Sequence, residues 1–385
     1  MYRFLESHDL PDLGQKTPYF CHFSFFSFGV TLYADRKDTV ALFRAVYANF
    51  ICPVLKEPDV TCHFISMSSL HNGPALIMNK TGFYSLPEKN GFIDYAELII
   101  FKYVIERIKD SILLHAGVVS KNGNGYIIYA PSGFGKTTLV MELVSRGYKF
   151  LSDEFCSLRL SDSSIDPFPR KLGIKDDSPF ASRIIPEKAY RFGLENKQFI
   201  ECEDLFSSSL GKACKPKYFI ELADIRQVEN SHSETVHTFN LNLFNDNPSL
   251  IARLSQYDAL DIGCRTETGC HVTYRISGSK GNAIIKVFQD IWKDFADDIL
   301  GVFYMSPHKP DFNGSPRMKK MLKFNTILKI STHLVNRSPI GSLLDKHNGS
   351  VVALLADIGG AVKDVDCYTL SPGPLTEMAD IIDSL

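Results

Sequence analysis

Regularly spaced cysteines are missing from this sequence. It has nine cysteines, an odd number, and no C-x-x-C pair occurs among them. A disulfide framework or a zinc ribbon needs regular cysteine spacings, so neither is expected here. Unpaired thiols are typical of a reducing compartment, and the pattern therefore predicts a cytoplasmic protein.

Long apolar runs and an excess of positive charge are also absent. No window of about 18 uninterrupted apolar residues occurs, which argues against a membrane-spanning helix, and the first residues lack the apolar region of a signal peptide. Lysine and arginine total 42 against 44 acidic residues, for a formal net charge of −2. A dedicated nucleic-acid-binding protein usually has a basic surplus, so we expect neither nucleic acid nor a membrane as partner.

Length and composition predict more than one domain. The chain has 385 residues, of which 44% are hydrophobic and 22% are charged, as in an ordinary globular protein. We expect a small N-terminal α/β lobe over residues 1–110, a core over 111–300, and a C-terminal α/β extension over 301–385 that packs on the core.

Hydrophobic periodicity assigns the elements outside the central segment. Asp38 is predicted to cap one helix of the lobe, and Asp94 with Glu97 to form a capping box at the start of another. Further along, helical spacing predicts a helix over 282–300, and the apolar run VVALLADI at 351–358 predicts a strand. The lobe has no catalytic pattern.

A glycine-rich loop carries the strongest functional signal. Residues 130–137 match the pattern G-x-x-x-x-G-K-[ST], except that Ala130 replaces the first glycine. The buried strand YIIYA precedes the loop, and the amphipathic helix TTLVMELVSR follows it and is predicted to end at Gly147. The candidate nucleotide-binding residues of the loop are Pro131, Ser132, Gly133, Phe134, Gly135, Lys136, Thr137 and Thr138.

These residue types suit the binding of a triphosphate. Gly133 and Gly135 let successive backbone N–H groups turn toward a phosphate, and the helix that starts near Lys136 adds its N-terminal amides. Lys136 would bring positive charge to the terminal phosphates, and Thr137 would offer its hydroxyl to Mg²⁺. Thr138 would contact the α-phosphate or cap the helix turn. An ordinary strand–turn–helix junction would not account for all of these features together.

Two adjacent carboxylates and a histidine lie close to this loop in the sequence. Asp153 and Glu154 follow the next predicted strand, whose end we expect beside the phosphates. One carboxylate could hold Mg²⁺ while the other accepts the proton of an attacking hydroxyl, and a solvated surface turn is the alternative. His115 lies on the predicted strand LLHAGVV, where a histidine buried in the core is the more common role.

In this order, the motifs resemble the catalytic core of HPr kinase/phosphorylase and, more closely, the HPr-kinase-related proteins encoded beside peptide-modification enzymes. The resemblance covers about fifty residues, from His115 through the loop and Arg146-Gly147 to Ser152-Asp153-Glu154. It implies an α/β fold with a P-loop core of the HPr-kinase/PEP-carboxykinase type. It further implies a kinase that uses ATP and Mg²⁺ and transfers the γ-phosphoryl group to a hydroxyl of a peptide, a protein or a small molecule.

The resemblance also assigns roles to individual residues. Asp153 occupies the place of the catalytic carboxylate that deprotonates the acceptor, Glu154 that of the second acidic residue, and His115 that of a histidine near the carboxylates. A weaker likeness extends to DPFPRKLGIK, where Arg170 or Lys171 would reach a phosphate or the acceptor. Alternatively, the two form a solvent-facing basic pair in a loop.

The chain departs from the family in one respect, because it has no E-x-R-G-x-G segment to supply an acidic metal ligand. The second metal ligand and any reverse phosphorylase activity therefore stay open. Relatives often form oligomers, so a homo-oligomer is an expectation. The alternative function is a nucleotide-dependent switch or sensor that phosphorylates no acceptor.

Overall fold

The structure of the protein is a computed structural model. It describes residues 2–4, 13–68, 73–80, 82–86, 92–131, 133–191, 197–224, 236–243, 248–255, 265–266, 269–277, 299–305, 310–332, 334–335, 346–348 and 350–385. Among these residues, no helix has both the length and the apolar character needed to cross a membrane.

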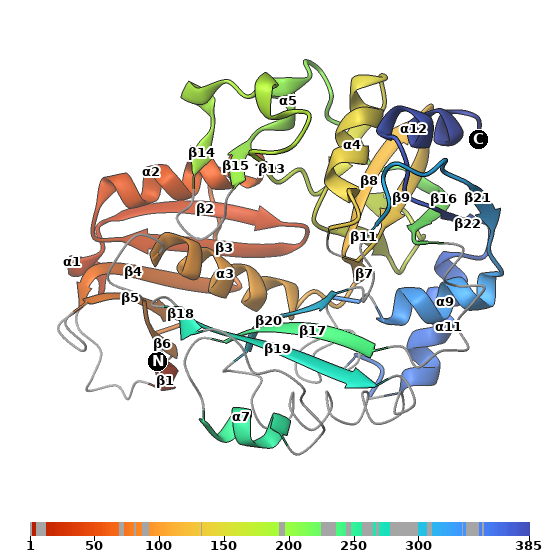
Figure 1. Ribbon diagram of the computed structural model, residues 1–385. Coiled ribbons are helices and arrows are strands. Elements are labelled where there is room, and N and C mark those ends of the chain that lie inside the picture. The colour runs from red at the N-terminus through yellow and green to blue at the C-terminus, as the bar shows by residue number, and fades with distance from the viewer. Residues whose placement is uncertain are drawn as a thin grey trace.

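A six-stranded sheet forms the N-terminal lobe, drawn in red and orange in Figure 1. Its spatial order is β1-β6-β5-β4-β3-β2, and all neighbours are antiparallel except β3 and β4, which are joined through α2. The elements of the lobe are β1 (Tyr2–Phe4), α1 (Leu13–Lys16), β2 (Tyr19–Phe25), β3 (Phe28–Ala34), α2 (Lys37–Val46), η2 (Ala48–Phe50), β4 (Val60–Ser68), β5 (Gly73–Met78), β6 (Gly82–Ser85) and α3 (Phe92–Ile105).

Aromatic residues build the core of the lobe. Alternation along β2 buries Phe23 and Phe25, whose rings contact that of Tyr47 at centroid distances of 5.2 and 5.1 Å. Phe168, from beyond the lobe, completes the same core and lies 5.7 Å from the ring of Phe101 on α3. The lobe therefore shares its core with the segment that follows the acidic pair.

The two predicted helix caps of the lobe are wrong. Helix α2 begins at Lys37 with Arg36 at the cap position, so Asp38 lies within the first turn. Helix α3 begins at Phe92, before Asp94, and Glu97 makes buried contacts with other elements instead of a local capping box. A buried hydrogen-bond network outweighs a local cap, because an unpaired buried carboxylate would cost more free energy.

A second six-stranded sheet contains the strand that leads into the glycine-rich loop. Its order is β10-β8-β9-β16-β22-β21, and β16 runs parallel to both β9 and β22. The carboxyl ends of these three strands therefore lie at one edge of the sheet. The elements are β8 (Ala116–Lys121), β9 (Asn124–Tyr129), α4 (Lys136–Ser145), β10 (Lys149–Ser152), β16 (Lys215–Leu222), β21 (Met318–Lys320), α9 (Lys323–Thr332), α11 (Val351–Ala361), β22 (Asp366–Leu370) and α12 (Leu375–Asp383).

Helices cover both faces of this second sheet (Figure 1). Ile128 of β9 packs in the cluster that contains α4 and α12, whereas its neighbour Ile127 packs in the cluster that contains α9 and α11. Adjacent residues of a strand point to opposite faces. A strand buried on both sides reads as the continuous apolar run seen in YIIYA.

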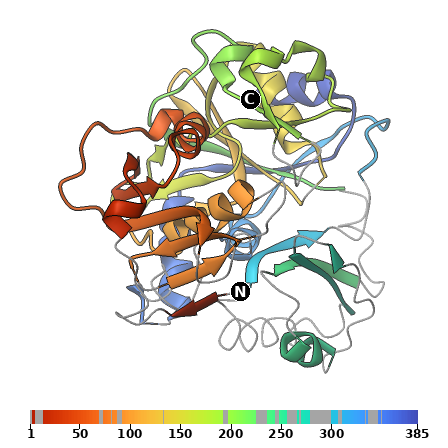
Figure 2. The same cartoon turned by 90° about the vertical axis from the view of Figure 1, so that its left-hand side faces the viewer.

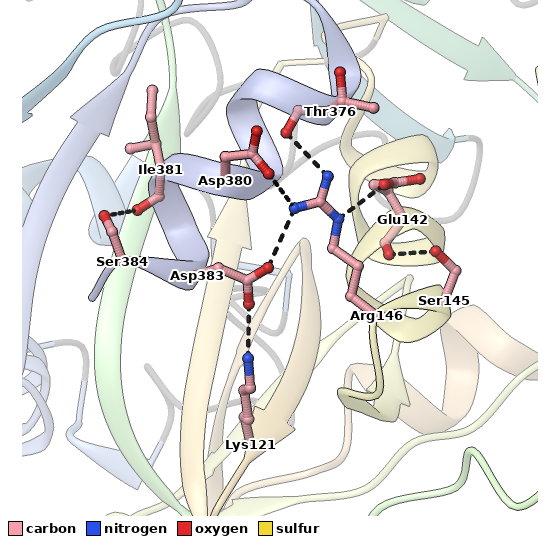
Figure 3. A network of polar contacts seen from close by, with 9 residues as sticks. All are labelled: Lys121, Glu142, Ser145, Arg146, Thr376, Asp380, Ile381, Asp383 and Ser384. Atoms are coloured by element: carbon pink, nitrogen blue, oxygen red, sulfur yellow. Dashed lines mark hydrogen bonds and ion pairs between the residues drawn. The ribbon is translucent and has the colours of Figure 1, made fainter.

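An arginine joins α4 to the C-terminal helix α12 (Figure 3). Arg146 donates to Glu142 at 2.9 Å, to Asp380 at 2.6 Å and to the carbonyl of Thr376 at 3.0 Å. A further contact at 3.2 Å reaches Asp383. The helix that starts at the glycine-rich loop is therefore tied at its other end to the last helix of the chain.

Smaller sheets complete the described structure. In Figure 1 and Figure 2, β17, β19 and α7 lie at the opposite end of the molecule from α4 and α12. The orders are β12-β11-β7, β13-β15-β14 and β18-β19-β17-β20. Their elements, with the remaining short helices, are β7 (Ser111–Leu114), β11 (Cys156–Arg159), β12 (Ile165–Asp166), β13 (Leu172–Lys175), η3 (Ala181–Arg183), η4 (Pro186–Lys188), β14 (Tyr190–Arg191), β15 (Lys197–Ile200), α5 (Cys202–Leu205), β17 (Val236–Leu243), α7 (Pro248–Ser255), β18 (Arg265–Thr266), β19 (Gly269–Ser277) and β20 (Ile299–Met305).

Two predicted strands differ from the structure. LLHAGVV is two strands, because β7 pairs with β11 while β8 pairs with β9, and His115 lies at the bend between the two sheets. The segment 351–358 belongs to helix α11, whose cap Ser350 accepts a hydrogen bond from the N–H of Ala353 at 3.3 Å. A short apolar run fits a strand or a buried helix equally well, and here packing against α9 and the sheet selects the helix.

Other predictions for the C-terminal half are not tested by the described residues. The predicted helix over 282–300 lies almost wholly outside them, and only its last two residues are seen, at the start of β20. The C-terminal strands β21 and β22 share a sheet with the loop strand β9. The division of the chain into three domains remains a prediction.

Candidate functional site

The glycine-rich loop has the backbone conformation that its glycines allow. Gly133 and Gly135 have φ values of +87° and +80°, in the left-handed region that side chains disfavour. Gly135 is the N-cap of α4. Because glycine has no side chain with which to cap the helix, the first N–H groups of α4 are left to other acceptors, such as an anion.

Three further loop residues lie around this turn. Ala130 is 1% exposed and is not among the described residues with positive φ, so its methyl group fits where the pattern has glycine. Phe134 is buried in the cluster beneath α4, and its N–H donates to the carbonyl of Pro131 at 3.4 Å. Ser132 lies outside the described residues, and Thr138 lies in the first turn of α4.

Asp153 contacts the first two residues of α4. The hydroxyl of Thr137 donates to Oδ2 of Asp153 at 2.7 Å, and Nζ of Lys136 donates to the backbone carbonyl of Asp153 at 2.9 Å. The acidic strand end and the glycine-rich loop therefore form one site. These contacts join residues that are 16 and 17 positions apart in the sequence.

The other carboxylate oxygen of Asp153 is buried without a hydrogen-bond donor among the described residues. Asp153 as a whole is only 7% exposed. Burial raises the pKa of its carboxyl to about 6, although the charge of Lys136 opposes this effect. Buried oxygens normally have partners, so Oδ1 of Asp153 suits a metal ion or the proton of a bound hydroxyl.

Glu154 is partly buried and faces other charges than Asp153 does. Burial acts to raise its pKa, but the positive charges of Arg170 and then His115 and Lys136 hold the pKa of Glu154 below its ordinary value. The side chain is therefore ionised at neutral pH. Unlike Asp153, it is kept charged by its surroundings.

Arg170 is held in place by the N-terminal lobe. Its guanidinium lies 2.5 Å from Oε1 of Glu97 and 4.3 Å from the ring centroid of Phe101. Glu97 also accepts a hydrogen bond from the hydroxyl of Tyr47 at 2.8 Å. With 16% exposure for the side chain of Arg170 and 8% for that of Lys171, the alternative of a solvent-facing basic pair is wrong.

Lys197 is a residue near the site that no sequence pattern indicated. Its positive charge lowers the pKa of both Asp153 and Glu154. A Cβ placed on Gly173 would lie 3.2 Å from Cδ of Lys197, so the lysine side chain crosses the β13 backbone closely. Only the pairing of β15 with β13 brings this lysine to the acidic residues, and that pairing is invisible in the local sequence.

Gly117 permits the close approach of α4 to the sheet. A Cβ at this position would lie 2.5 Å from Cγ2 of Val140, 3.4 Å from Cγ of Lys136 and 3.6 Å from Oδ1 of Asp153. A methyl group would therefore press on the helix that carries the loop lysine. Sequence reasoning missed this role, for which GVV on a strand gives no sign.

The donor set suits Mg²⁺ bound together with a phosphate. No cluster of three or more His, Cys, Asp or Glu side chains that could hold a metal occurs in the described part of the chain. Magnesium commonly uses only one or two carboxylates and takes its other oxygens from water and substrate phosphates. Thr137, Asp153 and Glu154 offer oxygens of this kind.

These features define a mixed α/β protein in which a glycine-rich loop and an acidic strand end meet beside one sheet. No protein-family profile matches the chain. Over 63 residues, which are 16% of this chain, it is 30% identical to the HPr kinase/phosphorylases of Clostridium botulinum strains Eklund 17B and Alaska E43. The match spans 21% of those relatives, about a fifth of their length.

One solved structure also aligns with part of the chain. The HPr(Ser) kinase/phosphatase from Coxiella burnetii aligns with 33% of this chain and 70% of its own chain, at 14% identity and a TM-score of 0.21. The sequence match confirms the predicted resemblance to HPr kinase/phosphorylase over a limited segment.

Proposed function

We propose that this protein is a kinase that transfers the γ-phosphoryl group of ATP to a hydroxyl group, with Asp153 as the general base. The observation that carries the proposal is the buried carboxylate of Asp153, which is bonded to Thr137 and keeps its second oxygen without a partner among the described residues. The likeness to HPr kinase/phosphorylase supports the same reaction class.

The loop residues bind the nucleotide in this proposal. The N–H groups around Gly133 and Gly135 and the first turn of α4 receive the phosphates. Lys136 donates to the backbone carbonyl of Asp153, so its ammonium group would hold the terminal phosphates next to the carboxylate of Asp153. Thr137 and Glu154 would hold Mg²⁺, which neutralises the charge of the phosphates.

Asp153 moves the proton. With a pKa of about 6 it is mostly ionised at neutral pH but still basic enough to accept a proton. The hydroxyl oxygen of the acceptor forms a bond to the γ-phosphorus and gives its proton to Asp153. At the same time, the bond between the γ-phosphorus and the oxygen that bridges it to the β-phosphorus breaks, and ADP leaves. Arg170 and His115 keep Glu154 ionised beside this base.

The acceptor is a Ser or Thr hydroxyl of a peptide or protein, or the hydroxyl of a small molecule. The relatives are named HPr kinase/phosphorylase. That name describes those enzymes and does not identify the acceptor of this chain. We infer a cytoplasmic kinase, and a homo-oligomer remains a prediction of the resemblance.

Labelled ATP tests the proposal directly. Wild-type protein is incubated with γ-labelled ATP, Mg²⁺, a library of Ser- and Thr-containing peptides and a panel of small alcohols. We expect label on one acceptor class and about a 10²- to 10⁴-fold loss in Asp153→Asn, the usual contribution of a general base. Nucleotide binding by the variant, measured by calorimetry, should persist.

Two outcomes would contradict the proposal. Equal transfer by Asp153→Asn would remove Asp153 from the role of base. ATP binding or hydrolysis by the wild type without label on any acceptor would favour a nucleotide-dependent switch, which needs only the phosphate contacts.

A further inference from the structure

The segment 310–317 brings an aromatic ring to the glycine-rich loop. A Cβ placed on Gly135 would lie 3.2 and 3.4 Å from Cε1 and Cζ of Phe312, so the ring touches the N-cap of α4. Phe312 is nevertheless 40% exposed and belongs to none of the buried hydrophobic clusters of the described residues. An exposed ring beside a phosphate-binding turn needs an explanation other than core packing.

The segment 310–317 is held by residues that follow β22 of the second six-stranded sheet. Gly373 packs so closely on this segment that a Cβ on Gly373 would lie 2.5 Å from the carbonyl oxygen of Gly314 and 2.6 Å from Cδ of Pro316. The N–H of Arg317 donates to Oγ of Ser371 at 2.8 Å, and the N–H of Ser371 donates to the carbonyl of Arg317 at 2.9 Å. These contacts lie just beyond the carboxyl end of β22, the edge at which β9 also ends.

We propose that Phe312 is the stacking surface for the base of the nucleotide whose phosphates the glycine-rich loop receives. The inference rests on the nucleotide binding of the proposed function and adds the residue that contacts the base. A phenyl ring stacks on any nucleobase, because every base has an aromatic face. Phe312 therefore contributes to affinity and does not discriminate ATP from GTP.

Comparing nucleotides with inorganic tripolyphosphate separates base contacts from phosphate contacts. Binding of ATP, GTP and tripolyphosphate in the presence of Mg²⁺ is measured by calorimetry for wild type, Phe312→Ala and Phe312→Trp. We expect Phe312→Ala to bind ATP and GTP about 5- to 150-fold more weakly, the loss that roughly 1–3 kcal/mol of stacking produces. Tripolyphosphate affinity should stay unchanged, and Phe312→Trp should retain nucleotide affinity.

Phe324→Ala is the matched control, because Phe324 lies on α9 and is 68% exposed; it should bind all three ligands as wild type does. Equal weakening of all three by Phe312→Ala would assign the ring to support of the loop and overturn the inference. Unchanged or tighter ATP binding would overturn it as well.

The failure of this inference is distinguishable from failure of the proposed function. If wild type binds ATP and tripolyphosphate but Phe312→Ala changes neither, only the stacking surface is wrong. If wild type binds neither ligand, the nucleotide site itself is wrong and the inference falls with it. Nucleotide binding without phosphoryl transfer would refute the kinase and leave the stacking surface standing.

Discussion

The candidate site has two sides that hold neighbouring carboxylates in different ways. On the loop side, Asp153 receives the hydroxyl of Thr137, and burial raises its pKa to about 6. On the lobe side, Glu154 faces Arg170, which the lobe residue Glu97 holds, and its pKa lies below the ordinary value.

Adjacent residues of one chain can thus have carboxyl pKa values that are shifted in opposite directions. Burial acts to raise the pKa of both carboxyls, so burial does not distinguish them. The difference comes from the charges that act on each carboxylate: Arg170 and His115 lower the pKa of Glu154, whereas the charge of Glu154 raises that of Asp153. The loop side is built by local sequence, whereas the lobe side is assembled from distant segments.

Removal of the loop lysine should have the largest effect, and this effect should fall on phosphate binding by the loop side. In Lys136→Ala, the phosphates lose their charge-assisted contact, and we expect nucleotide affinity to fall at least about 100-fold, to loss of detectable binding. Calorimetry with ATP measures it. The exposed Lys212 provides the control, since Lys212→Ala should bind as wild type does. Retained affinity in Lys136→Ala would refute the assignment of the loop.

Removal of the carboxylate of Glu97 should disrupt the lobe side of the site. Glu97→Ala leaves the guanidinium of Arg170 and the hydroxyl of Tyr47 without their buried acceptor. We expect a loss of about 3 kcal/mol in the free energy of unfolding, measured with denaturant. Tyr47→Phe should cost about 1 kcal/mol.

An exposed glutamate serves as the reference for this measurement. Glu203→Ala, at an exposed position of α5, should change the free energy of unfolding by less than about 0.5 kcal/mol. If Glu97→Ala were as mild as this control, the lobe would not hold Arg170 by the contact described.

Alanine substitutions at Gly117 and Gly360 test how tightly α4 packs on the sheet at the loop side. Gly117→Ala would place its methyl 2.5 Å from Val140, and we expect a cost of about 1–3 kcal/mol together with weaker nucleotide binding. Gly360→Ala, in helix α11, meets nothing within 4 Å and should stabilise the fold by about 0.5 kcal/mol. Thermal unfolding measures the stability of both variants, and calorimetry measures their nucleotide affinity. Unfolding at the wild-type temperature for Gly117→Ala would show that α4 tolerates displacement.

The smallest expected effect is on the pH dependence of transfer. Because Asp153 must be ionised to accept a proton, the rate should fall as pH drops below about 6. The charge of Glu154 contributes to raising the pKa of Asp153, so Glu154→Gln should move this acidic limb to lower pH. A pH–rate profile measures it, and a limb at the same pH in both proteins would contradict the coupling.

The two carboxyls should also act on stability with opposite signs. Between its ordinary pKa of 3.8 and about 6, native Asp153 binds more protons than it does when unfolded, so its contribution falls as pH rises through this window. Glu154, with a lowered pKa, contributes stability above its ordinary value of 4.5 and loses it as pH falls.

Local sequence was a good guide to the loop side. The strand YIIYA, the helix after the loop and the acidic strand end all lie where their patterns predict, and Gly147 follows α4 with a φ of +92°. Each of these features depends on a few adjacent residues, so composition and spacing carry enough information. The resemblance to HPr kinase/phosphorylase came from this same segment.

Periodicity failed where two structures fit one pattern. The apolar run at 351–358 suits a strand by composition, but it packs as a helix against α9. At His115, the chain leaves one sheet and enters another, and neither His115 nor its neighbours Leu114 and Ala116 is a glycine or proline that would mark the change. Which sheet accepts a strand is decided by its neighbours in space.

By itself, the sequence determined a turn of backbone amides between a buried strand and a helix, with a lysine and two carboxylates nearby, because those features follow from short-range sterics and charge. Only the tertiary structure decided that Glu97 would hold Arg170, that Lys197 would lie near the acidic pair and that Phe312 would touch Gly135. Such contacts depend on how whole sheets and helices pack, and the free energy of that packing is spread over many residues far apart in the chain.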